Sequence, residues 1–310
     1  MNIKTLIILF IVPCCLILVG ARPLKGQIRG QYASGLHATN SGTLAPPGLT
    51  YANMFQLSSF NESKDSNGNR RPISGNLSVL FDHNILNWTT TAAEHGMRYG
   101  FLADIPFSSD SLTHTDLGSL RSGAGLTDIY IQPLTLGWNS KRADIQITYG
   151  FIAPTGRFKG GATDNAGSGY WGNDVSSGQT VYLTKNKATS FSAYELYESH
   201  GTQRDTHVHP GQTFNLDYSL MQILPLQENK HTLLQFGLVG YGQYQTTDTS
   251  GPTITPERGS AHYRVNAMGG AANFMLPVRK AAISFKVLKE FGNRSTVQGY
   301  SIQIGGAITF

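Results

Sequence analysis

Cysteine is almost absent from this chain, because only Cys14 and Cys15 occur among its 310 residues. Both lie in an apolar stretch, Leu6 to Val19, that follows Lys4 and is closed by small residues up to Ala21. A short positive region, an apolar core and small residues at its end are typical of a secretory signal peptide. We therefore expect residues 1–21 to be removed, and the mature chain then has no disulfide and no thiolate chemistry.

Long apolar runs and dense charge are also missing. After the signal, no stretch reaches the roughly 18 apolar residues of a membrane-spanning helix. The net charge is only +5, from 24 Lys and Arg against 19 Asp and Glu, and no basic block predicts nucleic-acid binding. The chain is instead rich in Gly (35) and Tyr (14), which suit curved strands and interfacial aromatic girdles. No linker divides it into two domains.

The C-terminal stretch alternates strictly. From Tyr300 to Phe310 every second residue is apolar or glycine, and the residues between are small or polar. Period two predicts a β-strand, and an uncharged strand of this kind would be an aggregation-prone edge in water. We expect its apolar face to meet lipid and its edges to pair within a closed barrel; the alternative is the last strand of a secreted β-sandwich. The pattern of Gln303, Gly305, Ile308 and Phe310 also resembles the assembly signal of bacterial outer-membrane barrels.

The preceding chain repeats a unit of strand, short turn, strand and long loop. Short turns are predicted near residues 90–95, 139–143, 185–187, 225–230 and 277–280. Long loops are predicted near residues 61–72, 108–124, 155–173, 200–211, 247–260 and 291–298. This spacing predicts an all-β fold, a closed antiparallel transmembrane β-barrel of about twelve strands over residues 50–310, with short periplasmic turns and long extracellular loops. Residues 22–49 lack any period and are expected to form a periplasmic tail or a plug in the lumen.

The clearest strands can be divided into a lipid face and a lumen face. Polar side chains are costly in lipid, so within 145–151, 214–220 and 234–244 the polar parity is assigned to the lumen. The lumen-facing candidates for contact with a solute are Gln146, Thr148, Asn215, Asp217, Ser219, Gln235, Tyr241 and Gln243. Pro133 lies inside a predicted strand, and we expect a bulge there because proline cannot donate a ladder hydrogen bond.

Several further stretches carry a family resemblance. They are Gly42–Gly48 before the first strand, Gly125–Trp138, Tyr149–Gly156 and the pair Tyr170-Trp171. Through them the mature chain resembles the bacterial outer-membrane family of MetA-pathway phenol-degradation or SphA-like transporters. The resemblance implies a barrel that admits small hydrophobic or aromatic compounds, and no binding residues carry over from it.

Enzyme and metal chemistry have little support. None of the nine histidines is followed by serine two residues later, as in outer-membrane lipid-modifying enzymes, so we expect no catalytic site. His207 and His209 could share a metal with Asp205. Two or three ligands without a fixed fourth make a weak site, however, and a solvated loop is the better interpretation. We expect no metal and no cofactor.

Together these observations predict a channel or transporter in the outer membrane of a Gram-negative bacterium. Passive uptake of small hydrophobic or aromatic compounds is the leading hypothesis. The alternative is a surface barrel with a structural or adhesive role and no transport. The expected partners are outer-membrane lipids, the barrel-assembly machinery and small hydrophobic solutes, and no nucleic acid.

Overall fold

The computed structural model describes residues 29–71, 77–91, 95–109, 111–115, 118–162, 164–228 and 231–310. The expected signal peptide, residues 1–21, lies outside the described residues. Two predicted short turns and the first three predicted long loops are described only in part. Among the described residues, no helix combines the length and apolar character needed to cross a membrane.

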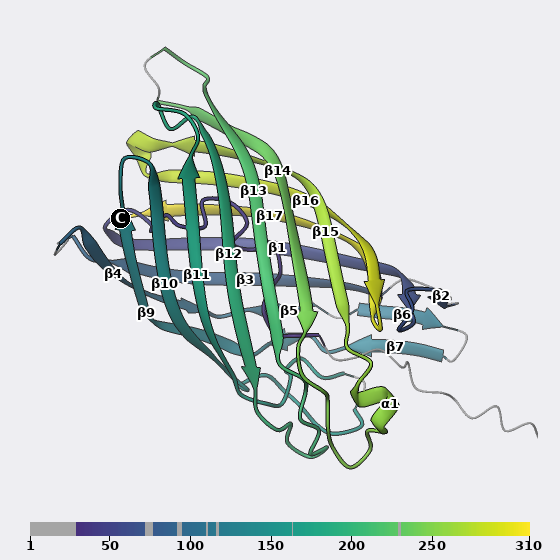
Figure 1. The fold of residues 1–310 in the computed structure, drawn as a ribbon. Coiled ribbons are helices and arrows are strands. Elements are labelled where there is room, and N and C mark those ends of the chain that lie inside the picture. The colour runs from purple at the N-terminus through teal and green to yellow at the C-terminus, as the bar shows by residue number, and fades with distance from the viewer. Residues whose placement is uncertain are drawn as a thin grey trace, which may run out of the picture.

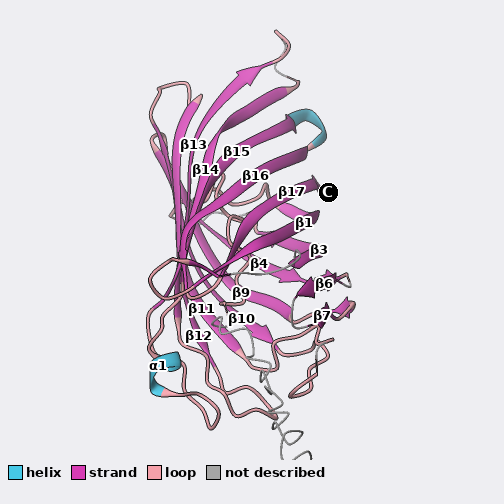
Figure 2. Cartoon of the chain, turned by 90° about the vertical axis from the view of Figure 1, so that its right-hand side faces the viewer, coloured by secondary structure: helices cyan, strands magenta, loops and turns pink. Residues whose placement is uncertain are grey.

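Antiparallel strands form one closed barrel (Figures 1 and 2). The strands are β1 (Gly48–Lys64), β3 (Leu77–Thr89), β4 (Met97–Asp104), β9 (Ile129–Asn139), β10 (Ala143–Ala153), β11 (Gly172–Tyr182), β12 (Thr189–His200), β13 (Thr213–Pro225), β14 (Leu233–Gln245), β15 (Arg264–Leu276), β16 (Ala281–Arg294) and β17 (Val297–Thr309). Each pairs with its neighbours in sequence, and β1 pairs with both β3 and β17, which closes the barrel. The prediction of a closed 12-strand antiparallel barrel is confirmed.

The remaining elements are short and belong to the connections. They are β2 (Arg70–Arg71), β5 (Phe107–Ser108), β6 (Ser111–Thr115), β7 (Gly118–Ser122), β8 (Gly125–Leu126), the helix α1 (Pro256–Gly259) and a 3-10 turn (Pro277–Arg279). The longer loops, including the one that carries α1, gather at the end of the barrel opposite to the C-terminus (Figure 1). The tight turns between β9 and β10 and between β15 and β16 lie at the other end.

One predicted long loop is wrong. Residues 291–298 were expected to form a loop, but β16 runs to Arg294 and β17 begins at Val297. Gly292 lies inside β16 with a φ of +60°, where the pairing with β15 shifts register. The Gly292-Asn293 pair therefore forms a bulge within a strand, which is a local use of glycine that resembles a turn in sequence.

The wall bulges as predicted at Pro133. In the pairing of β10 with β9, Tyr149 lies opposite Leu134, and the next pair is Phe151 opposite Ile131. Between these two pairs, Gln132 and Pro133 of β9 lie opposite the single residue Gly150 of β10. The Pro133 carbonyl oxygen accepts a hydrogen bond from the Tyr99 hydroxyl. The bulge removes the need for a ladder donor at the proline, and the prediction is confirmed.

The two faces of the wall differ in polarity. On β13, Asn215 and Asp217 are fully buried inside the barrel, whereas Leu220 on the opposite parity is 46% exposed. The outward parity of β17 is likewise apolar, with Ile304 and Ile308 both exposed. An apolar outer band around a polar interior is the arrangement that a barrel in lipid requires.

The N-terminal segment, residues 29–47, lies inside the barrel. It forms hydrogen bonds with inward-facing side chains of β16, β12, β13, β14, β10 and β11 in turn. Ala38 is fully buried in a cluster with Met221, Val239 and Leu288, which project from three of these strands. The segment therefore fills part of the lumen and is held there by side chains of the barrel wall.

Candidate functional site

Arg29 fixes the first described end of the N-terminal segment to β16 and β17. Its guanidinium donates to both carboxylate oxygens of Glu290, at 2.8 and 3.1 Å. The same side chain donates to the Val297 carbonyl oxygen at 2.6 Å and to the Thr296 hydroxyl at 3.1 Å. A forked pair of this kind fixes orientation as well as charge.

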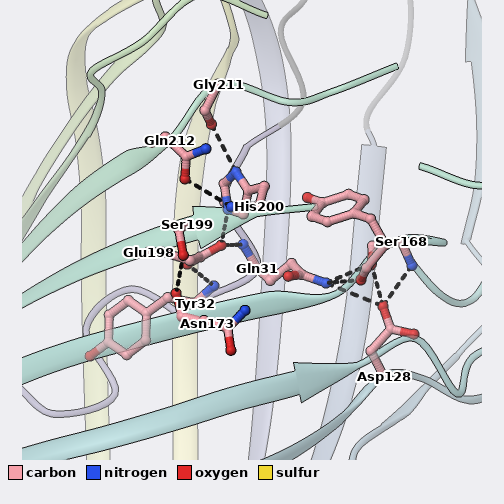
Figure 3. A network of polar contacts seen from close by, with 12 residues as sticks. Gln31, Tyr32, Asp128, Ser168, Asn173, Glu198, Ser199, His200, Gly211 and Gln212 are labelled. Atoms are coloured by element: carbon pink, nitrogen blue, oxygen red, sulfur yellow. Dashed lines mark hydrogen bonds and ion pairs between the residues drawn. The ribbon is translucent and has the colours of Figure 1, made fainter. Parts of the chain in front are cut away.

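Glu198 on β12 holds the next residues by their backbone. Its carboxylate accepts from the amides of Gln31, at 2.5 Å, and Tyr32, at 3.0 Å. Its partner on the other side is His200, whose second ring nitrogen lies 2.8 Å from the Gly211 carbonyl oxygen. Figure 3 shows this chain of contacts from the loop at Gly211 through His200 and Glu198 to the N-terminal segment.

The Gln31 side chain extends the same network to an outer loop. It donates to the Ser168 hydroxyl at 2.6 Å, and that hydroxyl donates to Asp128 at 2.5 Å (Figure 3). The Asp128 carboxylate also accepts from the backbone amides of Ser168 and Gly156, at 2.7 and 3.0 Å. One carboxylate thus links the outer loop of residues 154–171 to the N-terminal segment.

Asp217 and Lys286 hold the middle of the segment from two strands. Asp217 accepts from the Tyr32 hydroxyl at 2.6 Å and from the amides of Gly35 and His37 at 2.9 and 3.1 Å. Lys286 donates to the carbonyl oxygens of Gly35 and Leu36 at 2.8 and 2.9 Å. Donors and acceptors of the irregular backbone are therefore satisfied by buried wall charges, as non-helical backbone at membrane depth requires.

The last part of the segment lies against β10, β11 and β14. Asn40 and Gln235 exchange two side-chain hydrogen bonds of 3.1 and 2.9 Å. Gln146 donates to the Ser41 carbonyl oxygen at 2.6 Å, and Thr43 donates to Asp144 at 3.0 Å. These contacts lie toward the tight-turn end of the barrel, so the segment traverses much of the lumen.

A cavity of about 390 Å³ remains between the segment and the opposite wall. Its lining contains apolar residues of the wall together with carboxylates, tyrosines and two histidines, His37 and His83. The wall residues that line it include Gln56, Ser58, Phe60, Val79, Phe81, His83, Asp104, Pro106, Asp128, Tyr130, Ile152, Tyr170, Asp174, Tyr194, Tyr241, Gln243 and Glu290. The N-terminal segment closes the other side with residues 29–34, 36 and 37. A volume of this size is at the lower end of the range of roughly 300–1,000 Å³ for small-molecule sites.

The eight predicted lumen residues lie on the inward parity of their strands, but they do not form one site. Tyr241 and Gln243 line the cavity, whereas Gln146, Asp217 and Gln235 are engaged by the N-terminal segment. Thr148, Asn215 and Ser219 are buried elsewhere in the lumen. Contact with a solute therefore stays a prediction for all eight.

Sequence reasoning missed the charged residues that hold the segment and the polar pair in the cavity. These residues are His83, Asp104, Glu198, Lys286 and Glu290. Parity alone could have placed His83 inside, because Leu86 and Trp88 define the outward face of β3. No local signal connects any of them to residues 29–37.

The segment around His207 and His209 belongs to the loop network. His209 forms a β-bridge with Ser250, and the Asp205 carboxylate accepts from the Gly160 amide at 3.0 Å. The part of the chain that the structure describes contains no cluster of three or more potential metal ligands.

The fold and its polar, segment-filled lumen define the chain as an outer-membrane β-barrel, located in the outer membrane of a Gram-negative bacterium in contact with its lipids. A family model described as "Putative MetA-pathway of phenol degradation" matches residues 60–304. The chain belongs to this family.

Solved structures with the same fold share little sequence with it. A COG4313 outer membrane channel from Pseudomonas putida F1 matches with a TM-score of 0.68 and 13% identity, over 87% of this chain and 98% of that one. The beta domain of the Bordetella autotransporter BrkA matches with a TM-score of 0.51 and 9% identity, over 86% of this chain and 100% of that one. At these identities the likeness shows the fold. No curated protein matches the chain in sequence.

Proposed function

We propose that this barrel is a passive route for small hydrophobic compounds, aromatic ones among them, across the outer membrane. The observation that carries the proposal is the cavity of about 390 Å³ inside the lumen. Phe60, Val79 and Phe81 give it an apolar wall on β1 and β3, and Ile152 adds to it from β10. An apolar surface inside an otherwise polar barrel favours contact with hydrophobic solutes over hydrophilic ones.

The same proposal assigns residues 29–47 the role of a plug. A barrel of this strand number has little empty bore once side chains fill it, and the segment occupies part of that bore. Its polar contacts with Glu290, Glu198, Asp217 and Lys286 support a fixed position rather than a loose tail. The plug therefore limits passage of ions and hydrophilic solutes and forms one wall of the cavity.

A channel role is favoured over a catalytic or purely structural one. The COG4313 neighbour from Pseudomonas putida F1 is an outer membrane channel, and the proposal extends that role to this chain. A structural or adhesive surface protein would not need an apolar cavity that is enclosed by its own N-terminal segment. The barrel-assembly machinery and small hydrophobic solutes are the partners that this proposal requires.

The test of transport is initial-rate uptake of labelled toluene and benzyl alcohol by cells that express the protein or lack it. Intact cells are needed because such solutes cross a simple bilayer unaided, whereas the native outer leaflet slows them. Faster entry in the expressing strain is expected. Equal rates, with the barrel shown to be folded by heat-modifiable migration in gels, would favour the surface-protein alternative.

The test of the plug is conductance in planar bilayers. Deleting residues 29–45 should raise single-channel conductance, because the polar interior of the lumen is then open to ions. A deletion within the external loop, residues 252–258, is the control for a shortened chain and should leave conductance near that of the wild type. Unchanged conductance in the first variant would refute the plug.

A further inference from the structure

One polar pair in the cavity takes no part in holding the N-terminal segment. The Nδ1 atom of His83 lies 2.6 Å from the Oδ2 atom of Asp104. The two residues are only 7% and 6% exposed, and both line the cavity. Within the described ranges, the Nε2 atom of His83 and the Oδ1 atom of Asp104 have no hydrogen-bond partner. Leaving such atoms buried and unpaired is unfavourable.

The backbone holds this pair rigidly. Asp104 is the last residue of β4 and is paired with Ile85 of β3, so His83 is the next inward residue along β3. Beyond Asp104 the chain leaves β4 through Pro106, and the Ile105 amide donates to the Asn84 carbonyl oxygen at 3.0 Å. Side chains on paired strands are positioned more precisely than side chains on loops.

The chemistry of the free atoms selects a hydroxyl group. Because Nδ1 of His83 faces a carboxylate, it carries a proton, and Nε2 is the atom that meets a ligand. If the ring is neutral, Nε2 accepts a hydrogen bond from a hydroxyl. If the ring is charged, Nε2–H donates a hydrogen bond to the hydroxyl oxygen. A hydrocarbon satisfies neither atom.

Charge around the cavity disfavours an acidic ligand. Its lining includes the carboxylates Asp104, Asp128, Asp174 and Glu290. Among the side chains that the structure describes, the only Lys or Arg that lines the cavity is Arg29, and that guanidinium is paired with Glu290. A carboxylate solute would therefore meet like charges without a free cation, which opposes its binding.

The cavity also offers an apolar surface next to the pair. Phe81 precedes His83 on the inward parity of β3, and the two rings lie 6.1 Å apart between centroids. Val79 is the next inward residue and also lines the cavity. A solute with one polar end and one apolar body can thus contact both features at once.

We propose that His83 and Asp104 form a binding site for the hydroxyl group of an uncharged solute whose apolar body lies against Phe81 and Val79. This inference rests on the proposed function and names the solute class: alcohols and phenols, in preference to the parent hydrocarbon and to carboxylic acids. His83 and Asp104 are then specificity-determining residues of the channel.

The test is a ligand-observed NMR titration of the refolded mature barrel in deuterated detergent. Benzyl alcohol, toluene and benzoate share one ring and differ only in the group that would meet the pair. The wild type is expected to bind benzyl alcohol most tightly. His83→Phe should weaken benzyl alcohol binding about three- to tenfold, which corresponds to one hydrogen bond, and leave toluene binding unchanged. Equal affinities of the wild type for benzyl alcohol and toluene would overturn the proposal, as would an unaltered ratio in His83→Phe.

A control and a second variant guard against general damage to the barrel. Asn273→Leu removes another buried polar group of the lumen, one that contacts Gln235 and does not line the cavity, and it should keep the wild-type preference. Asp104→Asn keeps the shape of the side chain and should raise benzoate affinity relative to toluene. No rise in benzoate affinity would contradict the assigned role of the carboxylate. Heat-modifiable migration in gels reports the folded state of each variant.

Binding and transport remain separable in this design. If the wild type binds benzyl alcohol with the expected preference but cells gain no uptake, the site stands and the transport proposal fails. If uptake is faster but His83→Phe does not change the binding ratio, transport stands and the site at His83 and Asp104 fails.

Discussion

Arg29 and Glu290 form a forked ion pair although they are 261 positions apart in the sequence. Glu290 is also an acceptor for the Tyr241 hydroxyl at 2.9 Å and for Asn293 Nδ2 at 2.9 Å. The carboxylate is thus enclosed by donors, and the guanidinium has its charge balanced inside the lumen. Breaking a buried pair by removing one partner is strongly destabilising, because the remaining charge is left uncompensated.

Glu290→Gln should therefore loosen the plug. The substitution keeps the shape of the side chain and leaves Arg29 without a counter-charge, so we expect the open fraction of single channels in planar bilayers to rise roughly tenfold, for a cost near 1.4 kcal/mol. The matched control is Glu195→Gln, because Glu195 bonds to Ser177 and Gln179 on the outer face. Identical traces for the two variants would contradict the anchoring role.

Gly178→Ala tests the end of the plug near Ser41, whose backbone lies close to Gly178 of β11. A Cβ atom built on Gly178 would lie 1.9 Å from the backbone oxygen of Ser41. Backbone at that distance cannot move aside as a flexible side chain can, so residues near Ser41 must shift and conductance should rise. The control is Gly270→Ala, where a Cβ atom would meet only the Gly237 oxygen, at 3.8 Å. Equal conductance in both variants would show that Ser41 is not held against β11.

The barrel itself could be predicted because its determinants are local. Alternation along residues 145–151 and 214–220 sets the two faces of each strand. A polar side chain on the lipid face would destabilise the barrel, so the pattern is strict. The error at Gly292 has the opposite origin. From its neighbours in sequence alone, Gly292-Asn293 is typical of a turn. In the structure this pair lies in β16, where pairing with β15 makes it a bulge.

The sequence offered a plug as one of two alternatives for residues 22–49, but the contacts that hold it and the cavity beside it could not be predicted, because their determinants are distant in sequence. Arg29 has no local feature that points to Glu290, and the backbone of Gly35 is satisfied by Asp217 and Lys286 from two different strands. The lumen parity marked Asp217 as inward but could not tell a plug contact from a solute contact. Irregular backbone takes its shape from partners that the barrel supplies.

Acid should favour release of the plug through His37. This residue belongs to the N-terminal segment, and burial, with a smaller effect of Lys286, lowers its pKa from 6.5 to about 4. The His37 ring is stacked on Tyr194 at 4.5 Å and lies parallel to the ring of Tyr32. The released segment binds a proton near pH 6.5 and the inserted segment does not, so the inserted state loses stability as the pH falls from about 6.5 to about 4.

The measurement is the open fraction of single channels at pH 7.5 and pH 5, for the wild type and for His37→Gln. The wild type should open more often at pH 5, and the variant should lose most of that rise because glutamine does not titrate. Wall carboxylates such as Asp217 are the same in both proteins, so the difference between them isolates His37. A variant with the full wild-type response would show that the response arises from the wall.

Phe310→Asp tests how β17 closes the barrel. The Phe310 amide donates to the Leu49 carbonyl oxygen at 2.9 Å, and its side chain is 70% exposed on the outward parity. We expect the terminal aromatic ring to be recognised during assembly, so the variant should be secreted yet remain in the periplasm. Cell fractionation and heat-modifiable migration measure this, with Thr309→Ser as the control on the inward parity. Wild-type recovery of Phe310→Asp in the outer membrane would mean that closure of β17 onto β1 does not depend on the terminal ring.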